Sequence, residues 1–203
     1  MPPCFRIEKP YPIPLAGVDE AGCAPLAGPV VAAAVILDRT RFPRGINDSK
    51  VVPAPLRERI HDKLWQVARV GVGIATVEEI DTLNIYWARM LAMTRAVDAI
   101  GVEPEMVLVD GNRCPKWERP SVAIVAGDAK SRSIAAASIV AKVTRDRIMA
   151  EHDCAYPGYG WATNKGYPTP EHQAALKRLG PTPLHRRSFA LVRQQYALEL
   201  QAK

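Results

Sequence analysis

Residues 15–37 read LAGVDEAGCAPLAGPVVAAAVIL, and this stretch decides the fold. The short apolar run Leu15–Asp19 is followed by Glu20, so it ends in two acids. The run Pro29–Leu37 is continuous Val, Ala, Ile and Leu, which is typical of a strand buried on both faces. The residues between the two runs, 21–28, are small and rich in turn formers. The segment predicts two buried strands that can pair as a hairpin, with two carboxylates at the end of the first.

The rest of the chain alternates between helical and strand patterns. Apolar residues at three- and four-residue steps predict helices, and short apolar runs predict strands. The predicted helices cover residues 55–69, 78–100, 133–150 and 169–180, and the further strands cover 70–77, 106–109 and 122–125. This order predicts an α/β fold: a central mixed β-sheet flanked by helices, with a C-terminal helical region, and no strict doubly wound sheet. We expect a single domain over 1–203, with an α/β core of about residues 12–155 and a basic helical region of about residues 156–203.

The basic charge of the chain is concentrated near its C-terminus. The sequence holds 27 Lys and Arg against 21 Asp and Glu, a net charge of +6. Residues 161–203 contribute 7 − 2 = +5 of this charge: Lys165, Lys177, Arg178, Arg186, Arg187, Arg193 and Lys203 against Glu171 and Glu199. Two interpretations remain open, a solvated basic tail and an element that faces nucleic-acid phosphates.

Several classes of protein are disfavoured by composition. No apolar run approaches the about 18 residues of a membrane span, and the N-terminus does not have the pattern of a secretory signal. The four cysteines are far apart and form no CxxC pair: Cys4, Cys23, Cys114 and Cys154. Their spacing argues against a zinc ribbon or a disulfide scaffold and favours a cytoplasmic protein.

Carboxylates follow three of the predicted strands. Asp19 and Glu20 end the first, Asp110 follows Val109, and Asp128 comes shortly after the run 122–125. Acids from the ends of separate strands can meet at one edge of a sheet, where their charges require compensating cations. Oxygen ligands suit Mg²⁺ or Mn²⁺, and two such ions can act on both the attacking and the leaving oxygen of a phosphodiester. Each acid taken alone has an ordinary alternative, as a turn residue or a helix cap.

The ordered motifs resemble those of one known family. The segments that carry the resemblance are 16–22, 25–35, Asn47-Asp48-Ser49-Lys50, Asp110-Gly111-Asn112-Arg113, Gly127-Asp128-Ala129-Lys130, 134–146, Lys165-Gly166-Tyr167-Pro168-Thr169 and His185-Arg186-Arg187-Ser188-Phe189. Together, in this order, they resemble the type 2 ribonuclease H family, ribonuclease HII. The resemblance runs from about residue 15 to 190.

The resemblance implies a fold, an activity and a set of catalytic residues. It implies a ribonuclease H-like fold that hydrolyses RNA in RNA–DNA hybrids and cuts on the 5′ side of ribonucleotides embedded in duplex DNA. The expected products carry 3′-hydroxyl and 5′-phosphate ends. The family's metal-binding carboxylates fall on Asp19, Glu20, Asp110 and Asp128, which would hold two Mg²⁺ or Mn²⁺ ions.

The resemblance also implies substrate contacts. Tyr167 matches a tyrosine that stacks on the sugar next to the ribonucleotide, although a partly buried loop tyrosine is the alternative. The remaining candidates are Gly22, Cys23, Ala24, Asn47 and Lys50 in loops, and Lys142, Arg145, Arg186 and Arg187 as phosphate contacts. For Asn47 and Lys50 a polar turn is the alternative, and for Lys142 and Arg145 a solvated helix face.

One loop departs from the family pattern. Where the family has Gly-Arg-Gly, this chain has Gly22-Cys23-Ala24. Cysteine offers no guanidinium fork, and alanine adds a Cβ where glycine permits close approach. Two interpretations stay open: an active enzyme, or a ribonuclease HII-like duplex-binding protein with weakened activity or altered junction specificity.

The remaining predictions concern the substrate class and partners. A different ribonuclease H-fold nuclease acting on all-DNA junctions is a weaker alternative. We expect nucleic acid as the partner, no membrane association, and, from the family, a monomer. No clamp-binding motif is evident after Phe189.

Overall fold

The computed structural model describes residues 2–201, and its centre is one five-stranded sheet. The strands lie in the order β3-β2-β1-β4-β5. Their bounds are β1 Leu15–Ala21, β2 Val30–Ile36, β3 Arg69–Ala75, β4 Met106–Asp110 and β5 Ser121–Ile124. The helices are η1 Phe5–Glu8, α1 Ala54–Val67, α2 Val77–Leu83, α3 Ile85–Asp98, η2 Gly127–Ala129, α4 Arg132–Ala155, α5 Trp161–Asn164, α6 Pro170–Leu179 and α7 Ala190–Gln201.

The predicted hairpin and the mixed sheet are both confirmed. β1 and β2 pair antiparallel, with Gly17 opposite Val35 and Ala21 opposite Val31. β2 pairs antiparallel with β3, whereas β1, β4 and β5 run parallel to one another. The parallel half brings the C-terminal ends of β1 and β4 to the same edge of the sheet.

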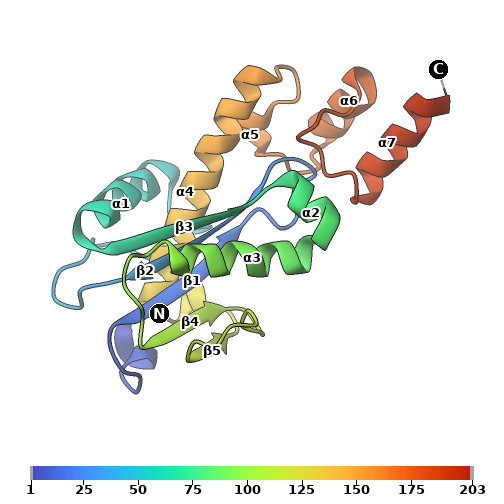
Figure 1. Cartoon of the computed structure of the whole chain (residues 1–203). Coiled ribbons are helices and arrows are strands. Elements are labelled where there is room, and N and C mark those ends of the chain that lie inside the picture. Colours follow the sequence, from blue (N-terminus) through green and yellow to red (C-terminus); the bar gives the residue numbers. More distant parts are fainter. Residues whose placement is uncertain (1, 202–203) are drawn as a thin grey trace.

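Helices cover both faces of the sheet, with α3 on one face and α1 and α4 on the other (Figure 1). The side chains of β2 alternate between these two layers, as the pleat requires. Ala32 and Ala34 face the layer that contains α3, whereas Ala33 and Val35 face the layer that contains α4. The continuous apolar pattern of β2 therefore reflects burial on both faces.

Gly17 allows the start of α4 to lie directly against β1. A Cβ at Gly17 would lie 2.2 Å from the carbonyl carbon of Ser133, so only glycine permits this approach. The buried carboxylate of Glu8 accepts hydrogen bonds from the Ser131 hydroxyl (2.7 Å) and the Ser133 amide (2.9 Å). A carboxylate at a helix N-terminus is stabilised by the exposed amides there. These contacts fix α4 beneath the strand that ends in Asp19 and Glu20.

The single helix expected over residues 78–100 is wrong, because the chain forms α2 and α3 with Asn84 between them. Asn84 has φ 67°, a left-handed value that breaks the helix, and its side chain accepts from the amides of Tyr86 and Trp87. Asparagine tolerates this conformation better than most residues and is a good N-cap.

The C-terminal region consists of α5, α6 and α7, which lie together at one end of the molecule (Figure 1). The helix expected over 169–180 is observed as α6: the Thr169 hydroxyl accepts from the His172 amide, and Gly180 follows the helix. Of the predicted basic residues of this region, Lys203 lies outside the described residues. No helix within residues 2–201 is both long and apolar enough to cross a membrane.

Candidate active site at the ends of β1 and β4

The parallel pairing of β1 and β4 brings the predicted acids together. Val18 pairs with Val109, so Asp19 and Asp110 follow directly on neighbouring strands. Asp110 Oδ1 accepts a hydrogen bond from the Gly127 amide (2.6 Å), which secures the turn that carries Asp128. Three separate segments thus place carboxylates at one edge of the sheet.

Burial and mutual repulsion raise the pKa values of these acids. The pKa of Asp19 lies well above its ordinary value because the group is buried and because Glu20, Asp110 and Asp128 place negative charge near it. Burial and the Asp110 charge also raise the pKa values of Glu20 and Asp128. Negative charge gathered in a partly buried place thus disfavours ionisation of these three acids, which is the situation that a bound cation relieves.

Glu20 has one partnered and one unpartnered oxygen. Its Oε1 lies 3.3 Å from Arg89 Nη1 and 3.5 Å from Cys23 Sγ, and Arg89 holds the pKa of Glu20 lower than burial alone would. Its Oε2 is buried and accepts no hydrogen bond within residues 2–201. A buried orphan oxygen among carboxylates fits a divalent cation, which prefers oxygen ligands. Within residues 2–201, no group of three or more His, Cys, Asp and Glu side chains is close enough to enclose a metal ion.

The loop of residues 22–24 begins two residues beyond Glu20. Gly22 has φ 99°, and a Cβ there would lie 2.1 Å from Arg145 Nε, so this position requires glycine. Burial, followed by the charge of Glu20, raises the pKa of the Cys23 thiol to about 12. Cys23 is therefore protonated near neutral pH and is a poor nucleophile.

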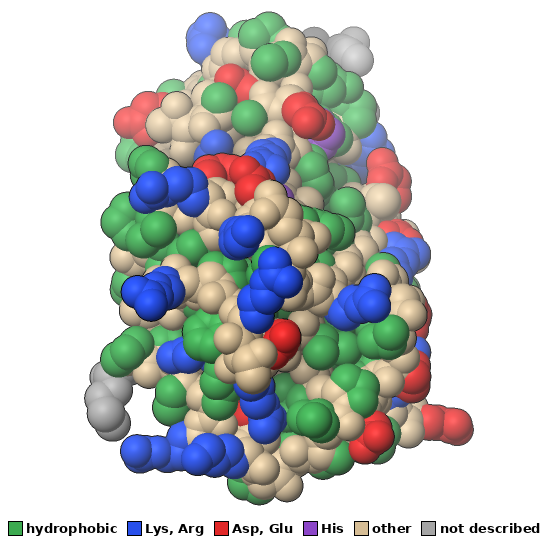
Figure 2. Space-filling model, turned by 90° about the vertical axis from the view of Figure 1, so that its left-hand side faces the viewer, with side chains coloured by type: hydrophobic (Ala, Val, Ile, Leu, Met, Phe, Trp, Pro, Cys, Tyr) green, Lys and Arg blue, Asp and Glu red, His purple; other side chains and the backbone are tan. Residues whose placement is uncertain are grey.

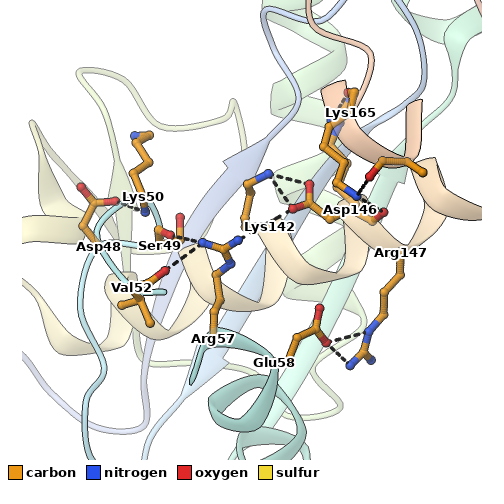
Figure 3. A network of polar contacts seen from close by, with 12 residues as sticks. Asp48, Ser49, Lys50, Val52, Arg57, Glu58, Lys142, Asp146, Arg147 and Lys165 are labelled. Carbon is orange, nitrogen blue, oxygen red and sulfur yellow. Dashed lines mark hydrogen bonds and ion pairs between the residues drawn. The ribbon is translucent and has the colours of Figure 1, made fainter. Parts of the chain in front are cut away.

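The loop Asn47–Lys50 lies on the other side of the acids. The side chain of Lys50 is mostly exposed, and its Nζ lies 3.8 Å from Asp128 Oδ2. Asn47 Oδ1 accepts a hydrogen bond from the Asp48 amide (2.9 Å). Arg57 of α1 holds this loop by donating to the carbonyls of Ser49 (2.5 Å) and Val52 (3.1 Å) (Figure 3).

Lys142 and Asp146 of α4 complete this polar network. Lys142 Nζ pairs with Asp146 Oδ1 at 2.5 Å, and Arg57 Nη2 lies 4.0 Å from Asp146 Oδ2 (Figure 3). Lys142 is thus already paired with an internal carboxylate, and burial lowers its pKa.

The expected direct phosphate contacts of Arg145 and Arg186 are wrong. Both side chains are buried, and their guanidinium groups donate to backbone carbonyls of the loops. Arg187 is different, because its side chain is exposed and its guanidinium lies 4.8 Å from the Tyr196 ring.

Tyr167 lies in a loop that is hydrogen-bonded to residues 22–29. Its side chain is 41% exposed, which leaves the ring open to a ligand. The neighbouring Gly166 accepts from the Leu26 amide (2.8 Å), which joins the two loops. The Tyr167 carbonyl lies 2.8 Å from His172 Nδ1. Trp161 Nε1 donates to His172 Nε2, so the neutral His172 carries its proton on Nδ1 and donates it to Tyr167.

Lys and Arg side chains are spread over the face of the molecule on the side of α1 (Figure 2). Sequence reasoning did not identify Arg89, Arg57 or His172 as parts of the site. Each acts on a partner from a different element, so no local motif marks it.

A mixed sheet with helices on both faces and carboxylates at the ends of adjacent parallel strands fits the ribonuclease H class of nucleases. The sequence model of the family "Ribonuclease HII" matches residues 16–192. The chain belongs to the ribonuclease HII family and is a ribonuclease H enzyme.

Relatives and solved structures agree with this assignment. A protein described as ribonuclease HII from Rhizorhabdus wittichii is 68% identical over 95% of both chains. One from Parvibaculum lavamentivorans is 58% identical over 94% of this chain and 71% of its own. The structure of ribonuclease H2 from Pyrococcus horikoshii OT3 matches with a TM-score of 0.77 and 29% identity, over 91% of this chain and 97% of that one.

A more distant structure bears on the fold alone. Bst-RNase HIII in complex with Mn²⁺ matches with a TM-score of 0.72 at 20% identity, over 92% of this chain and 70% of that one. The predicted ribonuclease H-like fold is therefore confirmed.

Proposed function

We propose that this enzyme hydrolyses RNA in RNA–DNA hybrids and cuts on the 5′ side of ribonucleotides embedded in duplex DNA. The expected products carry a 3′-hydroxyl and a 5′-phosphate. The observation that carries the proposal is the meeting of Asp19, Glu20, Asp110 and Asp128 at one sheet edge, beside the joined loops of Cys23 and Tyr167.

The four carboxylates would hold Mg²⁺ or Mn²⁺. Two bound cations would supply an activated water and stabilise the leaving 3′ oxygen. The raised pKa values and the orphan Glu20 Oε2 support this assignment, because both describe a site short of positive charge. The relative Bst-RNase HIII is described in complex with Mn²⁺.

The substrate is held by groups around the acids. The ring of Tyr167 stacks on the sugar next to the ribonucleotide, and the backbone of residues 22–24 faces the ribonucleotide itself. Lys50, with its exposed side chain, and Asn47 approach the backbone phosphate from the other loop. The exposed Arg187 offers a further phosphate contact, whereas Lys142 must first leave Asp146.

A single-ribonucleotide duplex gives the direct test. With Mg²⁺ or Mn²⁺, we expect one nick 5′ of the ribonucleotide, and cutting of a uniform RNA–DNA hybrid, with no cutting of all-DNA duplexes or junctions. If neither ribonucleotide substrate is cut at high enzyme concentration with either metal, the proposed activity is wrong. Cutting of an all-DNA junction would instead favour a different nuclease class.

The Cys23-Ala24 loop motivates the alternative of a duplex-binding protein with weakened activity. Reversion of both positions, Cys23→Arg with Ala24→Gly, separates the two. The alternative predicts that the double variant nicks at least about tenfold faster than the native chain. Equal rates would show that the loop does not limit activity, and this alternative would be abandoned.

The proposed partners and location follow from the same reasoning. Nucleic acid is the partner, and we expect a monomeric, cytoplasmic enzyme with four reduced cysteines. A structure of RNase HII from Archaeoglobus fulgidus is described as a complex with PCNA. For this chain we predict no clamp partner, and co-elution with a sliding clamp in size-exclusion chromatography would contradict that prediction.

A further inference from the structure

Two buried guanidinium groups meet beneath the loop of residues 22–29. Arg186 donates through Nη2 to the Gly22 carbonyl (2.6 Å), through Nη1 to Cys23 (3.0 Å) and through Nε to Gly28 (2.9 Å). Arg145 of α4 donates to Ala27 at 3.1 Å.

The two arginines also share a carbonyl. Arg145 Nε donates to the carbonyl of Pro29 at 3.0 Å, and Arg186 Nη2 donates to the same oxygen at 3.3 Å. Arg145 Nη1 reaches the Lys165 carbonyl at 3.0 Å, two residues before Tyr167. One cluster thus binds the end of β1, the start of β2 and the tyrosine loop together.

Neither arginine forms an ion pair in the described part of the chain, although their side chains are 1% and 0% exposed. Burial, followed by the charge of Arg145, lowers the pKa of Arg186 to about 9. Both groups stay charged at neutral pH, stabilised by carbonyl dipoles. Burying two like charges without a carboxylate is costly, so the arrangement is expected to serve the loop that it holds.

The direction of the held carbonyls fixes the direction of the neighbouring amides. In a trans peptide the carbonyl of one residue and the N–H of the next point opposite ways. Because the carbonyls of Gly22 and Cys23 turn inward to Arg186, the amides of Cys23 and Ala24 turn away from it. Neither amide donates a hydrogen bond to any residue within 2–201.

We propose that Arg186 and Arg145 are positioning residues that hold the Cys23 and Ala24 amides as a pair of donors facing the ribonucleotide. Their buried charges also make this donor pair attractive to a phosphate or a hydroxyl oxygen. The inference rests on the proposed function for the identity of the ligand. It assigns the shape of the loop to contacts with its backbone, which do not depend on the side chains of Cys23 and Ala24.

The test replaces the guanidinium group of Arg186 with a different cation. Arg186→Lys retains a cation but cannot donate to Gly22, Cys23 and Gly28 in one plane. We expect kcat/KM on a single-ribonucleotide duplex to fall about 10- to 100-fold, mainly through KM, and guanidinium chloride to restore part of it with Arg186→Gly. The matched control is Arg119→Lys, whose guanidinium pairs with Asp98 and Glu103 away from the loops.

A second readout does not depend on cleavage. In ¹⁵N-labelled protein without divalent metal, the amide signals of Cys23 and Ala24 should shift when a single-ribonucleotide duplex is added, and shift less with the all-DNA duplex. In Arg186→Lys, or in Arg145→Lys if the first variant does not fold, these amides should have lower ¹⁵N order parameters than in the native protein, because the loop backbone is no longer held.

The outcomes separate this inference from the proposed function. If the native enzyme cuts but Arg186→Lys matches it, or loses no more than Arg119→Lys, the inference is overturned. Unmoved Cys23 and Ala24 signals in the native protein also overturn it. If the native enzyme cuts nothing, the proposed function fails, whereas the order-parameter measurement still decides whether the arginines order the loop.

Discussion

Asp110 shows how one side chain serves both the fold and the proposed chemistry. Its Oδ1 accepts from the Gly127 amide, and its charge raises the pKa values of Asp19, Glu20 and Asp128. An amide at this position can still accept that hydrogen bond through its oxygen, but it carries no charge.

We therefore expect Asp110→Asn to remain folded and to lose at least about 100-fold in nicking rate, because a charged ligand is gone. Rates on a single-ribonucleotide duplex and a thermal melt measure the two effects. As a control, Asp38→Asn changes an exposed acid that bonds to Thr40, and its rate should match the native one. Unchanged cutting by Asp110→Asn would remove this residue from the site.

The buried histidines His172 and His185 lie behind Tyr167 and form a chain of neutral rings. His185 Nδ1 accepts from the Thr182 amide (3.0 Å), so its proton is on Nε2, which faces His172 Nε2 at 3.2 Å. Burial, followed by the charge of His172, lowers the pKa of His185 to about 3. A second proton on His172 would lie on Nε2, which already faces the donors Trp161 Nε1 and His185 Nε2.

This depressed pKa makes stability fall in acid. In the unfolded chain His185 titrates near 6.5, whereas in the folded chain it titrates near 3, so the unfolded state binds more protons between these values. The stability that the neutral His185 contributes is fully present above about pH 6.5. It is lost as pH falls, at about 1.4 kcal/mol of unfolding free energy per pH unit. Denaturant unfolding from pH 7.5 to 5 should show this loss.

The control for the histidine prediction removes the titration. His185→Gln lowers stability at pH 7.5, but its free energy of unfolding should depend less steeply on pH below 6.5 than that of the native protein. Parallel curves for the two proteins would mean that His185 does not carry the acid sensitivity.

Asn84 determines where α2 ends and α3 begins. Its left-handed backbone and its side-chain cap both depend on asparagine. The break lets α2 turn so that Asp81 accepts the amides of Arg187 (2.9 Å) and Ser188 (2.9 Å), which ties the C-terminal region to the core.

Two substitutions separate the contributions of Asn84. Asn84→Ala loses the cap and strains the backbone, so we expect a destabilisation of about 2 kcal/mol. Asn84→Gly relieves the strain and loses only the cap, so the cost should be below about 1 kcal/mol. Urea denaturation gives both values, and an alanine variant as stable as the glycine variant would contradict this account.

The elements show how far the sequence leads. The apolar runs predicted all five strands, and strand ends correctly indicated where the acids lie, because both are local patterns. The break at Asn84 was missed because the apolar period continues across it. The partners of Arg145 and Arg186 were missed because, except for the Lys165 carbonyl, they lie more than a hundred residues away in the sequence. Whether an arginine faces solvent or a carbonyl is decided by tertiary packing.

The charge distribution predicts how binding responds to salt. The net charge of +6 is spread over exposed side chains such as Lys50 and Arg187, while the two buried arginines face inward. Each phosphate contact contributes about −0.9 to the slope of log K against log salt concentration, so three to five contacts give about −3 to −5. Affinity for a duplex should fall about 50- to 1,000-fold between 50 and 200 mM salt.

Fluorescence anisotropy without divalent metal measures this slope. Arg187→Gln should make the slope about 0.9 less negative, which corresponds to one lost phosphate contact. Arg186→Lys should change the affinity and leave the slope nearly unaltered. A slope near zero for the native protein would show that contacts to backbone phosphates do not dominate duplex binding.

The hold of Arg186 on Gly22 and Gly28 also has a consequence for the order of events during synthesis. All four acids have been made once residue 128 is added, but Gly22 and Gly28 are held by a side chain made 158 or more residues after them. While the exit tunnel of the ribosome still covers residue 186, the nascent chain contains the four acids, but Arg186 has not yet bound the loop of residues 22–29. Residues 22–29 thus reach their final arrangement only late in synthesis or after release.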